Sequence, residues 1–187
     1  MAKESDEDIV RKIVETNEHE LFGELYERYK TKVYHKCISF SKDQDEAKDL
    51  LHDVFLKTFT SLSRFSGRSS FSTWLYSITY NYCVDYARSK RKRRTEDIDE
   101  RWDISDKDDE KNERELMSMH AERLGSVLDR ISPNEKAILL MKYQDGFSIK
   151  EIMGMLELSE SAVKMRIKRA KASALENYQE LFAEDLI

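Results

Sequence analysis

Six aromatic side chains stand directly before a cluster of positive charges in the stretch RSSFSTWLYSITYNYCVDYARSKRKRR, residues 68–94. The cluster occupies six of the last seven positions: Arg88, Lys90, Arg91, Lys92, Arg93 and Arg94. Aromatic rings stack on unpaired bases, and basic side chains beside them hold the flanking phosphates. This combination predicts a site for DNA whose strands are being separated. Packing is the competing interpretation, and we favour it for Phe71, Trp74 and Ile78.

Basic residues also gather in residues 159–175, which carry five positive charges and one negative charge. The whole chain has a net charge of −5, and residues 95–113 between the two basic patches hold ten acidic and three basic residues. Charges more than about 10 Å apart are screened at ordinary salt, so each basic patch attracts a DNA backbone locally. The acidic total therefore does not exclude a nucleic-acid partner.

The second basic patch lies in the segment SIKEIMGMLELSESAVKMRIKRAKASAL, which predicts a helix, a tight turn and a second helix with Ser159 as its N-cap. At about 100° per residue, Val163, Ile167 and Ala170 share the inward face. The opposite face and its flanks then present Ser161, Lys164, Met165, Lys168 and Arg169. This face suits a helix lying in a major groove. The alternative is a pair of amphipathic helices with a solvated basic face, which capping, turn length and charge sign disfavour.

Helices are expected to carry all of these groups. The chain has one proline and five glycines, too few for the turns of a β-rich fold, and 40% of its residues are hydrophobic. Apolar residues recur every three or four positions from Phe22, from Ala47 and from Phe71, which predicts three amphipathic helices in one bundle over roughly residues 5–94. Ser41 and Gln44 are expected to form the capping box of the second helix.

The C-terminal part predicts a separate domain. The sequence SPNE, residues 132–135, is a helix start with Ser132 as N-cap and Glu135 closing a capping box, and Gly146 is expected to end that helix. Residues 95–113 lack an apolar stripe and have the composition of a flexible linker. We therefore predict an all-α chain with two small helical domains, residues 1–94 and 114–187, joined by the acidic linker 95–113.

Several functions are not expected. Cys37 and Cys83 lie far apart in the sequence and predict buried, reduced thiols. The four histidines share no ligand spacing and no nucleophilic triad can be placed, so we expect no metal, no cofactor and no enzymatic activity. Residues 1–20 are too acidic for a signal peptide, and no apolar run approaches the ~20 residues of a membrane helix. A cytoplasmic protein without direct membrane insertion is expected.

Taken in order, these motifs resemble those of bacterial RNA polymerase sigma factors of the extracytoplasmic-function (ECF) class. FGELYERYKTKVY, AKDLLHDVFLKTF and RFSGRSSFSTWLYSITYNYCVDYAR are similar to the first conserved domain of that family, and LDRISPNEKAILLMKYQDGFSIKEIMGMLELSESAVKMRIKRAKASAL is similar to the second. The match covers roughly residues 22–175. It implies a transcription initiation factor whose partners are core RNA polymerase and promoter DNA, with an anti-sigma factor as an expected regulator.

The resemblance also implies site residues. Those implied for docking on the polymerase clamp are Asp45, Asp49, Leu50, His52 and Asp53. For the −10 element, the resemblance implies a loop that captures a flipped base and a helix that follows it. The residues implied there are Phe65, Arg68, Ser69, Ser70, Trp74, Tyr80, Asn81, Asp85, Arg88, Arg91 and Lys92. Those implied for the −35 element are Ser159, Ser161, Lys164, Met165, Lys168 and Arg169. The acidic linker resembles the segment that threads a basic channel of the polymerase.

Three positions depart from the family pattern. Glu157 stands where the family has glycine, and Met153 where it has a small residue. A non-glycine residue in a left-handed turn costs about 1–2 kcal/mol, so we expect an altered turn. Met165 replaces a residue that is often serine, which predicts contact with a thymine methyl group in place of a hydrogen bond.

Two other classes of protein compete with this interpretation. A helix-turn-helix transcriptional regulator with a helical partner-binding domain shares the second domain but needs neither the flipped-base loop nor the clamp-facing helix. A purely structural helical adaptor needs neither of the segregated basic patches. Binding to core RNA polymerase distinguishes the three classes.

Overall fold

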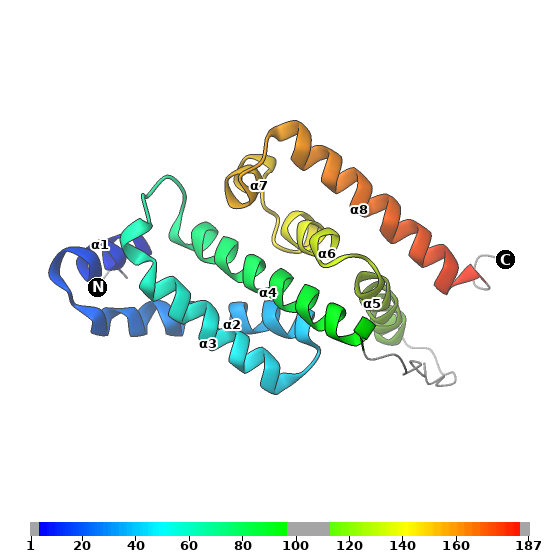
Figure 1. The fold of residues 1–187 in the computed structure, drawn as a ribbon, viewed down its shortest axis with the longest axis horizontal. Helices are drawn as coiled ribbons and strands as arrows, with labels where there is room; N and C mark the ends of the chain where they lie inside the picture. The colour runs from blue at the N-terminus through cyan, green and yellow to red at the C-terminus, as the bar shows by residue number, and fades with distance from the viewer. Residues whose placement is uncertain (1–3, 97–112, 184–187) are drawn as a thin grey trace. The chain divides into compact units, whose positions relative to one another are not determined.

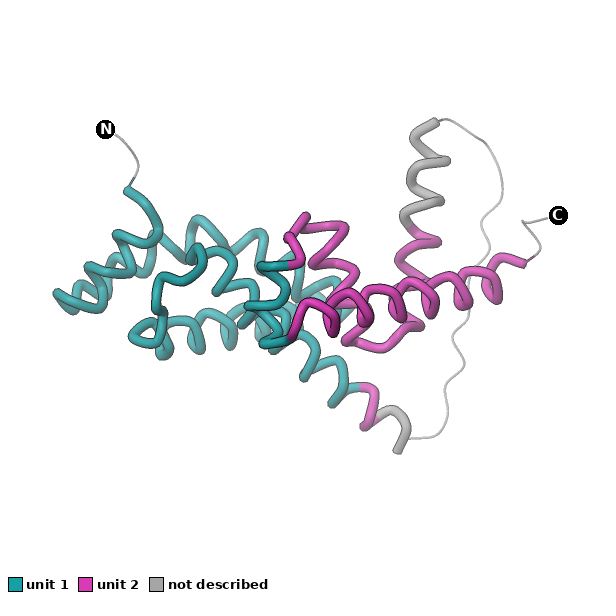
Figure 2. Tube along the Cα trace, turned by 90° about the horizontal axis from the view of Figure 1, so that it is seen from above, with its two compact units in different colours: residues 1–90, 150–158 teal, residues 91–149, 159–187 magenta. Residues whose placement is uncertain are grey.

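The structure is a computed structural model that describes residues 4–96 and 113–183, and every regular element in these ranges is a helix (Figure 1). The prediction of an all-α fold is confirmed. The predicted acidic linker falls almost wholly on residues 97–112, outside the described residues. None of the described helices is long and apolar enough to cross a membrane. Two compact units are distinguished, Met1–Lys90 with Lys150–Leu158, and Arg91–Ile149 with Ser159–Ile187 (Figure 2).

The apolar spacing predicted three helices, α2 (Phe22–Ser41), α3 (Gln44–Thr60) and α4 (Phe71–Glu96). The first unit contains α2, α3 and α4 as far as Lys90. α2 and α3 pack along each other, with the ring of Phe22 edge-on to Phe55 at 6.2 Å and to Phe59 at 5.1 Å between centroids. Cys37 and Cys83 are both buried, as predicted, and their thiol sulfur atoms lie 4.0 Å apart. A short 3₁₀ turn, η2 (Leu62–Arg64), follows α3.

The start of α3 differs from the prediction. Its N-cap is Asp43, whose carboxylate accepts hydrogen bonds from the backbone N–H groups of Asp45 and Glu46, both at 2.9 Å. These bonds, that from Glu46 first, hold the pKa of the Asp43 carboxyl below its usual value. The predicted capping box of Ser41 and Gln44 is wrong, because the left-handed Lys42 (φ 63°) ends α2 and brings Asp43 to the cap position.

A helix that the sequence analysis did not predict, α1 (Asp6–Thr16), precedes α2 and the short turn η1 (His19–Leu21). Ser5 caps it by accepting a hydrogen bond from Asp8 N at 3.1 Å, and the left-handed Asn17 (φ 58°) ends it. Its buried side chains, which share one face, are Ile9, Val10 and Ile13. α1 is therefore an integral part of the first unit.

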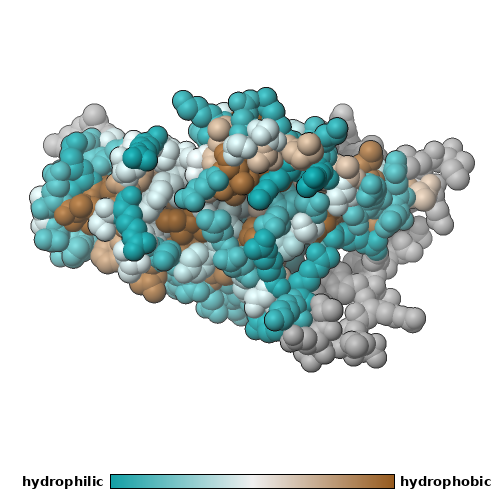
Figure 3. Space-filling view, turned by 45° about the horizontal axis from the view of Figure 1, so that its top comes forward, coloured by the Kyte–Doolittle hydropathy of each residue, from teal (hydrophilic) through white to brown (hydrophobic). Residues whose placement is uncertain are grey.

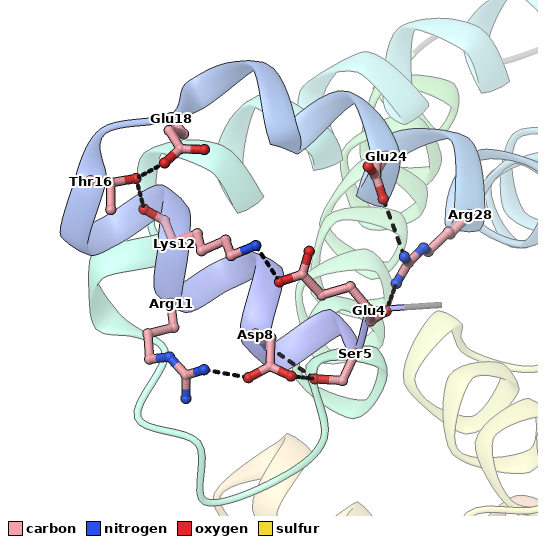
Figure 4. Close-up of polar contacts among 9 residues, drawn as sticks. All are labelled: Glu4, Ser5, Asp8, Arg11, Lys12, Thr16, Glu18, Glu24 and Arg28. Atoms are coloured by element: carbon pink, nitrogen blue, oxygen red, sulfur yellow. Dashed lines mark hydrogen bonds and ion pairs between the residues drawn. The ribbon is translucent and has the colours of Figure 1, made fainter. Parts of the chain in front are cut away.

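Polar contacts fasten α1 to α2 (Figure 4). The guanidinium of Arg28 donates to the carbonyl oxygen of Glu4 at 3.0 Å and pairs with Asp6 at 2.5 Å. The Tyr29 hydroxyl also donates to Asp6. Burial, followed by the contact with Asp6, raises the pKa of Tyr29.

The second unit is built from α5 (Glu113–Arg130), α6 (Pro133–Leu139) and α8 (Glu160–Leu181), with α8 packed against α5 and α6. The predicted capping box is confirmed: Glu135 N donates to Ser132 Oγ at 3.3 Å, and Ser132 N donates to the Glu135 carboxylate at 2.9 Å. A π-helical turn, η3 (Leu140–Gln144), continues α6, and Gly146 follows it with φ 73°.

The two predicted helices of the helix-turn-helix are α7 (Ile149–Leu156) and α8. Glu157 in the turn between them has φ 53°, so a non-glycine residue occupies the left-handed position. Whether the turn as a whole is altered stays a prediction. Leu158 N donates to Met153 O at 3.1 Å across the end of α7. Ser159 caps α8 by accepting from Ala162 N at 3.3 Å, and the helix runs six residues beyond its expected end near Leu175, to Leu181.

Candidate nucleic-acid interface

The loop between η2 and α4 is anchored by aromatic contacts at its first residue. Phe65 is half-buried, with its ring centroid 5.4 Å from that of Trp74 and 6.0 Å from that of Phe71. Gly67 has φ 68°, a left-handed conformation that suits glycine. Arg68, Ser69 and Ser70 follow, and all three are exposed. The loop therefore presents polar groups next to a fixed aromatic cluster.

The end of the loop is tied to the first turn of α4. Ser70 Oγ accepts a hydrogen bond from Thr73 N at 3.2 Å, and Glu7 of α1 accepts one from Phe71 N at 2.8 Å. The first N–H groups of a helix lack intrahelical partners, so these two side chains cap α4 together. Ser70 thus has a structural role besides its expected contact with DNA.

The residues predicted on α4 divide between its surface and the core. Asn81, Asp85 and Arg88 are exposed, and their spacing of four and three residues places them along one side of the helix. A guanidinium nitrogen of Arg88 lies 3.8 Å from a carboxylate oxygen of Asp85. Tyr80 is only 1% exposed and its ring lies against Phe40, so it cannot reach DNA from this position.

The basic cluster at the end of α4 is only partly available for DNA. Arg91 and Lys92 are exposed, and an Arg91 guanidinium nitrogen lies 3.4 Å from the carbonyl oxygen of Arg130. Lys90 instead pairs with Glu46 of α3 at 2.5 Å and donates to Ser41 O at 3.1 Å. The hydrogen bond from Lys90 holds the pKa of Glu46 below its usual value. The side chain of Arg94 lies outside the described part of the chain.

One side of α3 forms an exposed acidic surface. Asp45, Asp49, His52 and Asp53 are exposed, and Asp45 pairs with Lys48 at 2.8 Å. Leu50, by contrast, is 6% exposed and belongs to the core. The same side carries Leu56, which is 64% exposed and which the sequence analysis did not single out. This side of α3 therefore presents carboxylates together with one exposed apolar side chain.

The exposed side of α8 has the residues expected of it. Val163, Ile167 and Ala170 are buried, which confirms the predicted inward face. The predicted site residues at the start and along the other side are all exposed: Ser159, Ser161, Lys164, Met165, Lys168 and Arg169. Lys164 pairs with Glu160 at 2.5 Å one turn earlier, which lowers the pKa of the Glu160 carboxyl. The exposed surface near the start of α8 therefore carries small polar side chains and basic side chains.

Two family models match the chain: Sigma-70 region 2 over residues 25–93 and Sigma-70, region 4 over residues 121–173. The ECF RNA polymerase sigma factor SigX of Bacillus subtilis (strain 168) is 30% identical over 174 residues, which cover 90% of this chain and 88% of SigX. The chain belongs to the ECF RNA polymerase sigma factors. The predicted resemblance is thereby confirmed. As a sigma factor, the protein is a transcription initiation factor that directs core RNA polymerase to promoters, and sigma factors as a class are transcription factors rather than enzymes.

Other relatives extend along nearly the whole of this sigma factor. The RNA polymerase sigma-H factor of Pseudomonas aeruginosa is 25% identical, covering 98% of this chain and 99% of the relative. A solved structure of CnrH in complex with the cytosolic domain of CnrY has a similar fold, with a TM-score of 0.65 at 21% identity, covering 92% of this chain and 96% of CnrH. This chain and CnrH therefore share a similar fold over both conserved regions.

Three features of the sigma factor were missed by sequence reasoning. Helix α1 with Glu7 lies before the region 2 match, which begins at residue 25. Leu56 lies beside the apolar stripe of α3, and its exposure depends on how α3 packs. The pairing of Lys90 with Glu46 joins residues 44 positions apart, so no local pattern signals it.

Proposed function

We propose that this sigma factor contacts the polymerase and the −10 element through its predicted domain 1–94 and reads the −35 element through its predicted domain 114–187. The observation that carries the proposal is α8, where exposed polar and basic residues stand opposite a buried apolar face. Such a helix can enter a major groove without disturbing its own core. The matches to region 2 and then region 4 along the chain support the order of the two parts.

For the −10 element we propose the loop and the exposed side of α4. The loop supplies Phe65, Arg68, Ser69 and Ser70, next to Trp74. The helix supplies Asn81, Asp85, Arg88, Arg91 and Lys92, all of which are exposed. Tyr80 is left out of this surface because it is buried. Capture of an unstacked base by the loop offsets the few kcal/mol that unstacking costs.

For the polymerase contact we propose the exposed side of α3. Asp49, His52 and Asp53 lie within two helical turns, and Leu56 continues the surface by one more turn. Exposed carboxylates around an apolar side chain favour a basic partner that buries the leucine. Leu50 supports this surface from the core instead of touching the partner.

Regulation by an anti-sigma factor is also proposed. The sigma factor RpoE of Bartonella quintana, solved in complex with the anti-sigma factor NepR, resembles this chain with a TM-score of 0.60 at 20% identity, covering 84% of this chain and 96% of RpoE. A sequestering partner of the same kind fits a factor whose DNA-binding and polymerase-binding surfaces are exposed. We further propose that the protein works in the cytoplasm, carries out no reaction itself and leaves RNA synthesis to the polymerase.

Run-off transcription tests the proposal. Core RNA polymerase is incubated with the full-length chain and a template library with randomised −35 and −10 segments. Discrete transcripts that need the added chain, and that share two sequence elements, are the expected result. A chain that is folded by circular dichroism but gives no chain-dependent transcripts would contradict it. Core polymerase alone is the control for initiation at template ends.

A further inference from the structure

The first backbone N–H group of α4, that of Phe71, has its hydrogen-bond partner 64 residues earlier in the chain. The carboxylate of Glu7 in α1 accepts from this group at 2.8 Å. The side chain of an N-cap residue reaches the N–H group of the second or third helical residue, but not that of the first. Ser70 accordingly accepts from Thr73 N at 3.2 Å, and Glu7 satisfies a donor that the local cap does not reach.

The partner of Glu7, rather than its exposure, distinguishes this carboxylate. Glu7 is exposed, and hydrophilic groups are spread over the face of the molecule shown in Figure 3, with apolar patches between them. Phe71, which donates to Glu7, is fully buried at the junction of α4 with residues 65–70, the base-capture loop. Replacing Glu7 therefore removes a hydrogen bond at this junction without taking a side chain out of the core.

Both ends of the base-capture loop meet at Phe71. At the first end, the ring of Phe65 stands edge-on to that of Phe71, with 6.0 Å between the centroids. At the last end, the peptide that joins Ser70 to Phe71 carries the N–H group bound by Glu7. The ring of Phe71 also packs against Tyr29 of α2 at 5.7 Å. The position of Phe71 therefore sets the span of the loop and the direction in which its last residues enter α4.

Contacts on both sides of Glu7 fix α1. Before it, Arg28 of α2 donates to the carbonyl oxygen of Glu4 at 3.0 Å (Figure 4) and pairs with Asp6 at 2.5 Å. After it, Ile9 is completely buried. A carboxylate on a fixed helix loses little conformational freedom when it accepts a hydrogen bond. α1 therefore connects α2 to the start of α4.

We propose that Glu7 is a positioning residue for strand opening. Through the hydrogen bond from Phe71 N, it holds the end of the base-capture loop in the conformation that receives the unstacked base. α1, which precedes the region 2 match at residues 25–93, thereby takes part in promoter opening. The inference rests on the proposed base capture and adds to it a residue that touches neither the base nor the phosphates.

The size of the effect follows from the order of the loop before capture. The loop offsets the cost of unstacking only in the conformation that fits the base. A loop already in this conformation loses little further freedom on capture, which strengthens binding. Without the hydrogen bond to Glu7, only a fraction of the molecules have the loop in place, and the apparent affinity falls by that fraction. Loss of one helix cap corresponds to about a fivefold change in such an equilibrium.

Binding of a single-stranded −10 oligonucleotide to holoenzyme measures base capture without the cost of melting. The oligonucleotide carries the non-template strand of a promoter recovered from the run-off library, either intact or abasic at one position. The abasic position that most weakens binding by the wild-type protein marks the captured base. Glu7→Ala should bind the intact strand about fivefold more weakly, and should bind the strand abasic at that position as wild type does. Equal losses on both strands, or no loss on either, would overturn the inference.

Glu7→Gln tests the hydrogen bond itself. The amide oxygen can still accept from Phe71 N, whereas the negative charge is lost. This variant should bind the intact strand more tightly than Glu7→Ala does, with an affinity close to that of wild type. Equal losses in the two variants would assign the effect to the charge and reject the positioning role.

The matched control is Glu20→Ala, which removes an exposed carboxylate from η1, the turn that follows α1. It should bind both strands as wild type does. A loss equal to that in Glu7→Ala would show that the effect is not specific to Glu7 and would also reject the positioning role. Circular dichroism and titration with core polymerase establish that the compared variants are folded.

The loop variant Arg68→Ala with Ser69→Ala separates this inference from the proposed function. If only the loop variant loses binding to the intact strand, base capture stands and the role of Glu7 is rejected. If the loop variant binds the intact strand normally, the loop captures no base and both proposals are rejected. Where both variants lose binding, they are combined. A combined loss no greater than that of the loop variant shows that Glu7 acts through the loop, whereas additive losses overturn the inference.

Discussion

The carboxylate of Glu46 in α3 lies 2.5 Å from the ammonium group of Lys90 in α4. Lys90 also donates to the carbonyl oxygen of Ser41, the last residue of α2, at 3.1 Å. One side chain therefore joins three helices of the first unit at the end where α2 meets α3. The consequence is a division within the basic cluster, in which Lys90 stabilises the fold while its neighbours Arg88, Arg91 and Lys92 face solvent.

The first prediction concerns stability. Glu46→Gln should lower the free energy of unfolding at neutral pH by about 0.5–1 kcal/mol, a modest amount because both side chains are about one-third exposed. Since the folded pKa of Glu46 lies below its ordinary 4.5, this contribution is complete above pH 4.5 and is lost as the pH falls through the lowered pKa. Urea unfolding followed by circular dichroism should show the two proteins converging in acid.

The matched control for this measurement is Glu27→Gln, which removes an exposed pair with Lys30 on a single helix. Glu27→Gln should change the free energy of unfolding less than Glu46→Gln does, because the pair of Glu27 and Lys30 lies within one helix and joins no separate elements. A difference between wild type and Glu46→Gln that persists unchanged in acid would mean that the carboxylate charge does not stabilise the fold.

The second prediction concerns the polymerase. Asp49→Lys with Asp53→Lys reverses two charges one turn apart on the exposed side of α3 and should weaken binding to core RNA polymerase by about 1–3 kcal/mol. A fluorescence titration of core polymerase measures the affinity. The control is Glu176→Lys with Glu180→Lys, an exposed acidic pair of the same spacing on α8. Equal affinities for both double variants would remove the docking role from α3.

Helices and caps with a local signal were predictable from the sequence, whereas long-range contacts were not. The spacing of apolar residues in α2, α3 and α8 repeats within a few turns, and the capping box of Ser132 and Glu135 lies within four residues. α1 was missed although its N-cap Ser5, its acidic first turn and its apolar face are local helix signals, whereas its attachment through Arg28 and Phe71 farther along the chain has no local signal.

Exposure was harder to predict than helix position. Tyr80 and Leu50 were expected at binding surfaces from their places in the family motifs, yet both are buried because the neighbouring helices cover them. A motif aligns positions along the chain, but burial depends on which face of a helix another element packs against. The face of α8 was predicted correctly because three buried residues at helical spacing define it without reference to a distant segment.

The third prediction concerns the −35 element. Lys168 lies near the middle of the exposed side of α8, five residues after the buried Val163, and Arg169 lies on its flank. Lys168→Ala should weaken binding to the preferred sequence by about 1–3 kcal/mol and relax base preference, whereas Arg169→Ala should weaken all sequences alike. Binding to a set of −35 duplexes with single substitutions measures both effects. If Lys168→Ala leaves the preference intact, α8 approaches the groove in another orientation.

The last prediction separates strand opening from duplex binding. Arg68→Ala with Ser69→Ala alters the exposed loop but keeps Ser70, whose removal would cost about 1 kcal/mol through loss of the α4 cap. This variant should bind promoter duplex normally at moderate salt yet fail to open it, because the base pocket no longer offsets the cost of unstacking. Neutralising Arg88, Arg91 and Lys92 should instead weaken duplex binding and flatten its salt dependence, since each phosphate contact releases counterions. Permanganate footprinting of unpaired thymines, alongside a binding assay at several salt concentrations, measures the two effects separately. Normal opening by the loop variant, together with loss of opening in the basic variant at saturating concentration, would show that the phosphate contacts and not the loop drive strand separation.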